Sequence, residues 1–122
     1  MEENNKIIAE FMGFTFEKNL GYYDNEMLLE QIVYEQQNGN CFNELLFDKS
    51  WDWLMSVIEK IRNNHFVTNV NYNTGGDFII EGLTSTEVLN IIINREDFKS
   101  DLEMCYFGVV EFINFYNKQK EE

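Results

Sequence analysis

The segment from Asp101 to about Lys118 constrains the fold most, because its spacing predicts a helix with a very wide apolar face. Ser100 and Glu103 stand at the spacing of a capping box, in which the serine hydroxyl accepts a backbone N–H of the first turn. The residues at helical spacing behind this cap are mostly large and apolar: Leu102, Met104, Cys105, Tyr106, Phe107, Val109, Val110, Phe112, Ile113, Phe115 and Tyr116. One neighbour covers only a stripe of a helix. We therefore expect this helix to lie across a sheet and to contact a second element or subunit.

A second helix is predicted over Trp51–Ile61. Asp48 and Ser50 are good cap residues in front of it. Its apolar stripe consists of Trp51, Leu54, Ile58 and Ile61. Trp51 and Trp53 cannot share one helical face, so we expect one in the core and the other partly exposed.

The remaining segments read as a short helix, several strands and turns. Asn5–Met12 predicts a short amphipathic helix that ends at Gly13. Phe14, Phe16 and then Leu20–Tyr23 predict a short strand that enters a turn, and this turn includes Tyr22–Asp24. Further strands are expected at Cys41–Phe47, Phe66–Tyr72, Phe78–Gly82 and Thr86–Ile93. Thr74–Asp77 holds two glycines and predicts a hairpin turn, whereas Met27–Tyr34 suits a strand or a helix.

These elements predict an α+β domain. We expect an antiparallel sheet of about four to five strands, layered with two main helices and the short N-terminal helix. A length of 122 residues and a hydrophobic fraction of 44% fit a single domain, 1–122, with its own core.

The charge of the chain excludes some partners. Twenty-two acidic residues against nine basic ones give a formal net charge of −13, so direct binding to a nucleic-acid backbone is not expected. The acids are spread along the chain. They predict either a solvated, soluble surface or a surface that attracts a basic partner.

The residues that carry chemistry are few and scattered. His65 has no partner at metal-ligand spacing, and Cys41 and Cys105 are expected to be reduced and structural. Gly75 and Gly76 lack the strand–glycine–helix context of a phosphate loop. We therefore predict no catalytic residues, no cofactor and no metal, and a protein that is not an enzyme.

The sequence also predicts a location. No stretch approaches the ~18 continuous apolar residues of a membrane span, and the start Met1–Asn5 is acidic and polar, unlike a signal peptide. We expect a cytoplasmic protein.

Three blocks of the chain resemble a family of small phage and prophage proteins, the phage ABA-sandwich domain. The blocks are Ile7–Gly13, Ser50–Ile61 and Val109–Asn117, in that order. The resemblance implies a helix–sheet–helix layering and a phage origin. It implies no catalytic residues. Residues 20–47 and 82–100 lie outside the blocks and look like insertions.

A phage origin favours a counter-defence role in the bacterial host. The hypothesis is an acidic, non-enzymatic, stoichiometric inhibitor of a host nucleic-acid-handling defence complex, comparable to an anti-CRISPR protein, whose partner is a basic protein or ribonucleoprotein. The insertions are where we expect the partner-binding residues, namely Tyr22, Tyr23, Asp24, Glu26, Glu30 and Glu35, followed by Arg95, Glu96 and Asp97.

Two alternatives stay open. One is a sponge for a nucleotide immune signal, although only Arg62 and Arg95 offer guanidinium groups for phosphate. The other is a phage accessory or structural protein that assembles through its apolar last helix. A homodimer is compatible with both alternatives.

Overall fold

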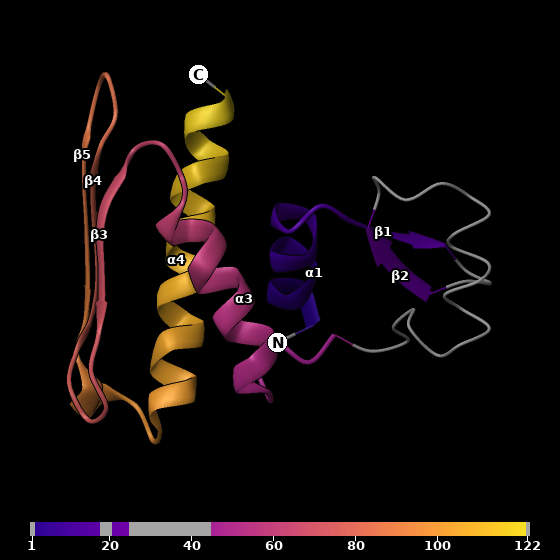
Figure 1. Ribbon diagram of the computed structural model, residues 1–122, viewed down its shortest axis with the longest axis horizontal. Coiled ribbons are helices and arrows are strands. Elements are labelled where there is room, and N and C mark those ends of the chain that lie inside the picture. The colour runs from indigo at the N-terminus through magenta and orange to yellow at the C-terminus, as the bar shows by residue number, and fades with distance from the viewer. Residues whose placement is uncertain (1, 18–20, 25–44, 122) are drawn as a thin grey trace. The chain divides into compact units, whose positions relative to one another are not determined.

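The chain forms two compact units, Met1–Leu46 and Phe47–Glu122, in the computed structural model, which describes residues 2–17, 21–24 and 45–121. In the first unit, helix α1 (Glu2–Phe11) is followed by the antiparallel hairpin of β1 (Phe14–Glu17) and β2 (Gly21–Asp24) (Figure 1). This agrees with the short N-terminal helix that the sequence predicts.

Turn chemistry explains how α1 ends. Gly13 has a φ of 81°, in the left-handed region that glycine adopts without strain, and it stands two residues after Phe11, the last residue of the helix. The predicted turn at Tyr22–Asp24 is wrong, because these residues belong to β2 and pair with β1. These three residues therefore pair with a neighbouring strand and do not form a loop.

Two other sequence expectations fall on residues 25–44. Met27–Tyr34 lies outside the described residues, as does Cys41–Glu44 of the predicted strand Cys41–Phe47. The described end of that segment is not a strand: Leu45 and Leu46 have no regular structure, and Phe47 begins a turn.

The second unit contains a three-stranded antiparallel sheet. Its strands are β3 (Val67–Tyr72), β4 (Phe78–Leu83) and β5 (Val88–Ile93), with β4 in the middle. The α+β class is confirmed, but the predicted count of four to five strands is too high. The hairpin β1–β2 forms a two-stranded sheet of its own instead of extending this one.

Both long helices of the second unit pack on the sheet and on each other. Helix α3 (Trp51–Arg62) contacts β3, whereas α4 (Asp101–Glu121) lies over β4 and β5 and also contacts α3. Figure 1 shows the two helices on the same side of the sheet. The predicted contact of α4 with both a sheet and a second element is thus confirmed.

Side-chain caps begin both helices where the sequence places them. Ser50 Oγ accepts the N–H of Trp53 at 3.4 Å, and Ser100 Oγ accepts the N–H of Glu103 at 3.1 Å. Each hydroxyl satisfies a backbone donor that has no partner inside the helix.

The core lies between the helices and the sheet. It is built from the buried side chains of alternate strand positions and of the facing helix stripes: Val70, Phe78, Ile80, Leu89, Ile93, Leu54, Val57, Ile58, Ile61, Met104, Cys105, Val109, Phe112 and Ile113. Gly108 lets α4 approach closely, since a Cβ there would lie 2.7 Å from the ring of Phe78.

The two tryptophans differ from expectation in one respect. Trp53 is half-buried, with its ring 5.0 Å from that of Phe47, and Trp51 is 36% exposed. Trp51 therefore does not complete the buried stripe of Leu54, Ile58 and Ile61, because it stacks on a strand side chain at the rim of the core.

Candidate functional site

A cleft of about 600 Å³ opens where the starts of α3 and α4 meet the end of β3. The short 3₁₀ helix η1 (Arg95–Asp97) borders it. Its lining combines aromatic, apolar and charged side chains: Trp51, Met55, Tyr72, Thr74, Arg95, Lys99, Ser100, Asp101 and Leu102.

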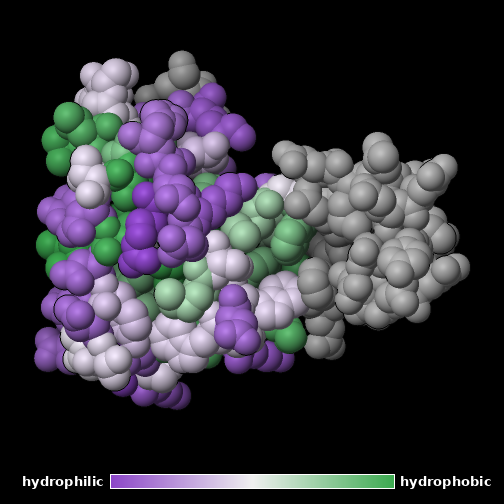
Figure 2. All heavy atoms as spheres, viewed as in Figure 1, coloured by the Kyte–Doolittle hydropathy of each residue, from purple (hydrophilic) through white to green (hydrophobic). Residues whose placement is uncertain are grey.

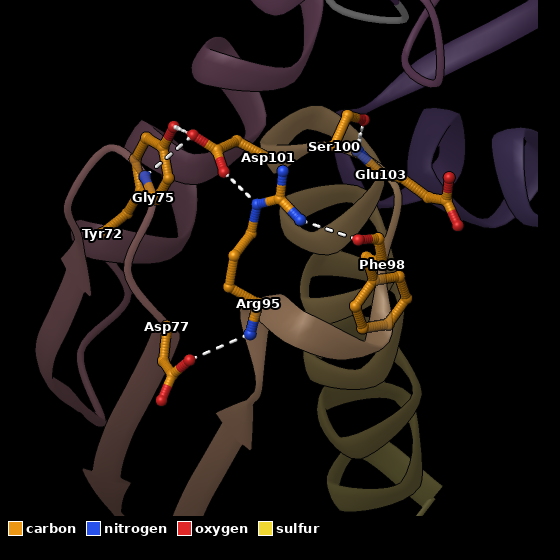
Figure 3. Close-up of polar contacts among 8 residues, drawn as sticks. All are labelled: Tyr72, Gly75, Asp77, Arg95, Phe98, Ser100, Asp101 and Glu103. Carbon is orange, nitrogen blue, oxygen red and sulfur yellow. Dashed lines mark hydrogen bonds and ion pairs between the residues drawn. The ribbon is translucent and has the colours of Figure 1, made fainter.

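The carboxylate of Asp101 organises one wall of the cleft (Figure 3). Its Oδ2 accepts the hydroxyl of Tyr72 at 2.8 Å and the backbone N–H of Gly75 at 3.1 Å. Its Oδ1 accepts the Nε–H of Arg95 in an ion pair. We call Tyr72, Gly75, Arg95 and Asp101 the Asp101 cluster. It joins β3, the β3–β4 turn, η1 and α4.

The electrostatics of this cluster follow from its donors. The hydrogen bond from Gly75 lowers the pKa of Asp101, and the bonds from Tyr72 and Arg95 lower it further. Burial raises the pKa of Tyr72, and its hydrogen bond to the Asp101 carboxylate adds to this rise. At neutral pH the cluster therefore holds an ionised carboxylate against a protonated phenol.

Both guanidinium groups of the chain make contacts within the second unit. Besides pairing with Asp101, Arg95 donates from Nη1 to the carbonyl of Phe98 at 2.7 Å. Arg62 pairs with Glu59 at 3.1 Å and donates to the carbonyl of Val70 at 3.4 Å. Their charge is thus largely balanced inside the fold.

An aromatic pair forms the other wall of the cleft. The rings of Trp51 and Tyr72 are stacked, with centroids 5.6 Å apart and planes at 26°. Met55, one turn further along α3, is 38% exposed. This wall offers an apolar, planar surface that a partner side chain can cover.

Three exposed acids lie beside the Asp101 cluster. Asp77 accepts the backbone N–H of Arg95 at 2.9 Å, which holds the β3–β4 turn against η1. Glu96 and Asp97 follow in η1 and are exposed, as Asp77 is. We call Asp77, Glu96 and Asp97 the acidic patch. Lys99, an exposed cation, lines the neighbouring cleft.

The partner-binding residues predicted from the sequence have different outcomes. Glu96 and Asp97 lie exposed on η1, and Arg95 lies in the Asp101 cluster. Tyr22, Tyr23 and Asp24 lie on β2. Glu26, Glu30 and Glu35 fall outside the described residues.

Two observations bear on cysteine and metal chemistry in the described part of the chain. Cys105 is a free, buried cysteine, and burial, followed by the charge of Asp101, raises its pKa to about 12. Residues 2–17, 21–24 and 45–121 contain no group of three or more His, Cys, Asp or Glu side chains that could hold a metal ion. Within the same residues, no helix combines the length and the apolar character that crossing a membrane requires.

Sequence reasoning missed the cleft itself. The three main residues of the cleft come from three different elements. Trp51 belongs to the predicted apolar stripe of α3, Tyr72 ends strand β3, and Asp101 is an acidic residue in the first turn of α4. The only local indication was the position of Tyr72 and Asp77 on either side of a glycine turn.

Comparison with known proteins adds no relative: no family model, no curated protein and no solved structure matches the chain. The resemblance to the phage ABA-sandwich domain therefore stays a prediction.

Proposed function

We propose that the chain is a non-enzymatic binding protein that occupies the basic groove of a host nucleic-acid-handling defence complex, in the manner of an anti-CRISPR protein. The observation that supports this is that the partly exposed Trp51–Tyr72 pair and the acidic patch both adjoin Arg95. The defence role itself follows from the predicted phage origin.

The chemistry of the cleft suits an arginine-rich partner. A guanidinium group stacks on aromatic faces and pairs with carboxylates, so the Trp51–Tyr72 pair and the exposed carboxylates of the acidic patch favour the same side chain. Arg95 does not compete for that role, because Asp101 already balances its charge. Lys99 opposes a cationic partner locally, and we expect it to turn towards solvent or towards a phosphate when the partner binds.

The net charge of −13 adds a long-range contribution. A surface of one sign steers an oppositely charged partner and raises the rate of association, and this effect weakens as salt is added. Nucleic acid and this chain would then compete for the same basic groove.

The test is a direct binding measurement. The full chain is mixed at low salt with purified CRISPR effector ribonucleoproteins, and complexes are separated by size-exclusion chromatography. We expect a stoichiometric complex that target nucleic acid displaces. Absence of a complex with every effector tested would contradict the proposal.

Two charge-reversal variants locate the contact. Glu96→Lys should weaken binding about tenfold, because it places a cation in the acidic patch against a basic groove. Glu81→Lys makes the same change at an exposed position of β4, outside the patch and outside the cleft lining, and should have a much smaller effect. Equal losses would assign binding to the net charge alone and remove the role of the patch.

The nucleotide sponge remains an alternative with less support. A phosphate ligand needs cationic donors, and both Arg62 and Arg95 are engaged within the unit. A thermal-shift screen with cyclic nucleotides tests it, since a rise of several degrees for one compound would favour the sponge.

A further inference from the structure

The two outer strands of the three-stranded sheet have opposite character. Strand β3 exposes polar side chains at Thr68, Asn69 and Asn71, and Arg62 donates to the carbonyl of Val70. Such features discourage pairing with a further strand. Strand β5 (VLNIII) carries no charge and no proline, and within the described residues no strand pairs with its outer side.

The open side of β5 borders a groove. This groove, of about 400 Å³, lies between β5 and α4. Its lining residues are Glu87, Val88, Leu89, Asn90 and Ile91 from the strand side and Glu111, Asn114, Phe115 and Lys118 from the helix. We call it the β5–α4 groove. Glu111 and Lys118 are both exposed and stand two turns apart, so they lie on the same helical face.

The geometry of the groove is self-complementary. Gly108 is level with Ile93, since a Cβ on Gly108 would lie 3.4 Å from the Ile93 side chain. From Gly108 to the midpoint of Glu111 and Lys118, the helix rises roughly 10 Å, which equals about three strand residues. The midpoint of the two charges is therefore level with Asn90, the central polar residue of β5.

A two-fold axis that passes through Asn90 is consistent with the level of the strand and with the level of the two charges on the helix. Strand β5 would pair antiparallel with its copy, with Val88 opposite Ile92 of the second copy and Asn90 opposite itself. The same axis inverts α4, so that Glu111 comes level with Lys118 of the second copy. The interface would hold two such charge pairs, and the exposed Val88 and Ile92 would become cross-strand neighbours.

The spacing of the helices also fits. Helix α4 contacts both β4 and β5, and we therefore take its axis to lie about half a strand spacing, roughly 2.4 Å, inside β5. Adding one further strand at the usual spacing of about 4.8 Å then brings the two copies of α4 to roughly 10 Å. Packed helices lie about 8–10 Å apart. The added sheet and the added helix contact thus form without a change in the fold.

We propose that the β5–α4 groove is a dimer interface whose occupant is the same groove of a second copy of this chain. The dimer carries a continuous six-stranded antiparallel sheet with both copies of α4 on one face. This proposal concerns self-association alone and does not depend on the proposed function.

The test uses the full chain in sedimentation velocity across a concentration series, with charge-swapped variants. Glu111→Lys places like charges opposite Lys118 of the second copy, and Lys118→Glu does so opposite Glu111. Each should weaken the dimer about tenfold or more. The double variant, Glu111→Lys with Lys118→Glu, restores both charge pairs and should recover the wild-type dissociation constant.

The matched control is Glu96→Lys, the same charge reversal in the acidic patch, which should leave the dimer unchanged. Amide hydrogen exchange supplies a second measurement. Backbone amides of β5 should gain protection as concentration rises, whereas those of β3 should not. A wild-type chain that stays monomeric up to about millimolar concentration would overturn the proposal. A dimer that neither single swap weakens, or that the double swap fails to restore, would also overturn it.

Discussion

The two ends of α4 are held in place by different kinds of interaction. At its start, the Asp101 cluster joins four elements through hydrogen bonds and an ion pair next to solvent. In its second half, an aromatic cluster forms around Phe66, whose ring centroid lies 5.9–6.2 Å from those of Phe112, Phe115 and Tyr116. Phe112 at this second end is fully buried, so its packing contributes directly to stability. The polar end determines the geometry of the cleft.

This contrast explains where function can reside. Directional contacts near solvent hold side chains in defined positions while leaving polar and aromatic groups accessible. At the aromatic end, Phe112 is fully buried, whereas Phe66, Phe115 and Tyr116 are half-buried, and Phe115 lines the β5–α4 groove. The candidate site lies at the polar end, where donors and acceptors from several elements converge, and substitutions at the two ends should have distinguishable effects.

The largest expected effect is at the aromatic end. Phe112 is fully buried, so Phe112→Ala removes a large apolar side chain and leaves a cavity. We expect the free energy of unfolding to fall by about 3–5 kcal/mol, measured by chemical denaturation. Phe107→Ala is the matched control on the same helix. Phe107 is 43% exposed, and its loss should cost much less. Equal costs would contradict the comparison.

The next effect lies between the two ends, at Gly108. An alanine Cβ would lie 2.7 Å from the ring of Phe78, which is fully buried and cannot move aside. Overpacking of this kind costs about 1–3 kcal/mol, and the better helix propensity of alanine returns up to about 1. Gly108→Ala should therefore lower stability. Asn117→Ala, exposed on the same helix, should raise it slightly, and a rise for both variants would show that α4 tolerates a wider spacing from the sheet.

At the polar end, Ser100→Ala should cost about 1 kcal/mol through loss of the helix cap. Ser50→Ala provides the comparison, because the Ser50 bond to Trp53 is longer, at 3.4 Å against 3.1 Å for Ser100 to Glu103. We expect the Ser100 variant to be the less stable of the two in thermal unfolding. The reverse order would indicate that cap geometry does not control these helix starts.

The smallest effect should appear as a pH dependence. The pKa of Asp101 is lowered in the folded state, so its contribution is present above the usual carboxyl pKa and is lost as pH falls through the lowered value. The stability difference between wild type and Asp101→Asn should therefore be largest near neutral pH and should shrink in acid. Tyr72→Phe removes one donor to the carboxylate and should make the difference smaller. A difference that is independent of pH would remove the electrostatic role of Asp101.

Local patterns predicted many of the elements correctly. The caps Ser50 and Ser100, the stop at Gly13 and the hairpin at Thr74–Asp77 are decided by neighbouring residues, and the structure confirms them. Strand β5 was also expected from its β-branched residues. The strand count was wrong because pairing depends on residues far apart in the chain, and nothing local shows that β1 and β2 form their own sheet.

The candidate site shows the same division. Sequence alone determined the excess of acids and the apolar face of α4, since composition and periodicity follow from neighbouring residues. It also predicted Glu96 and Asp97 as partner-binding candidates, and their exposure is seen in the structure. Only the tertiary structure decided that Asp101 neutralises Arg95, that Trp51 stacks on Tyr72, and that Glu111 and Lys118 share a groove with β5. Each of these contacts joins different elements, and their distances are set by how the helices pack on the sheet.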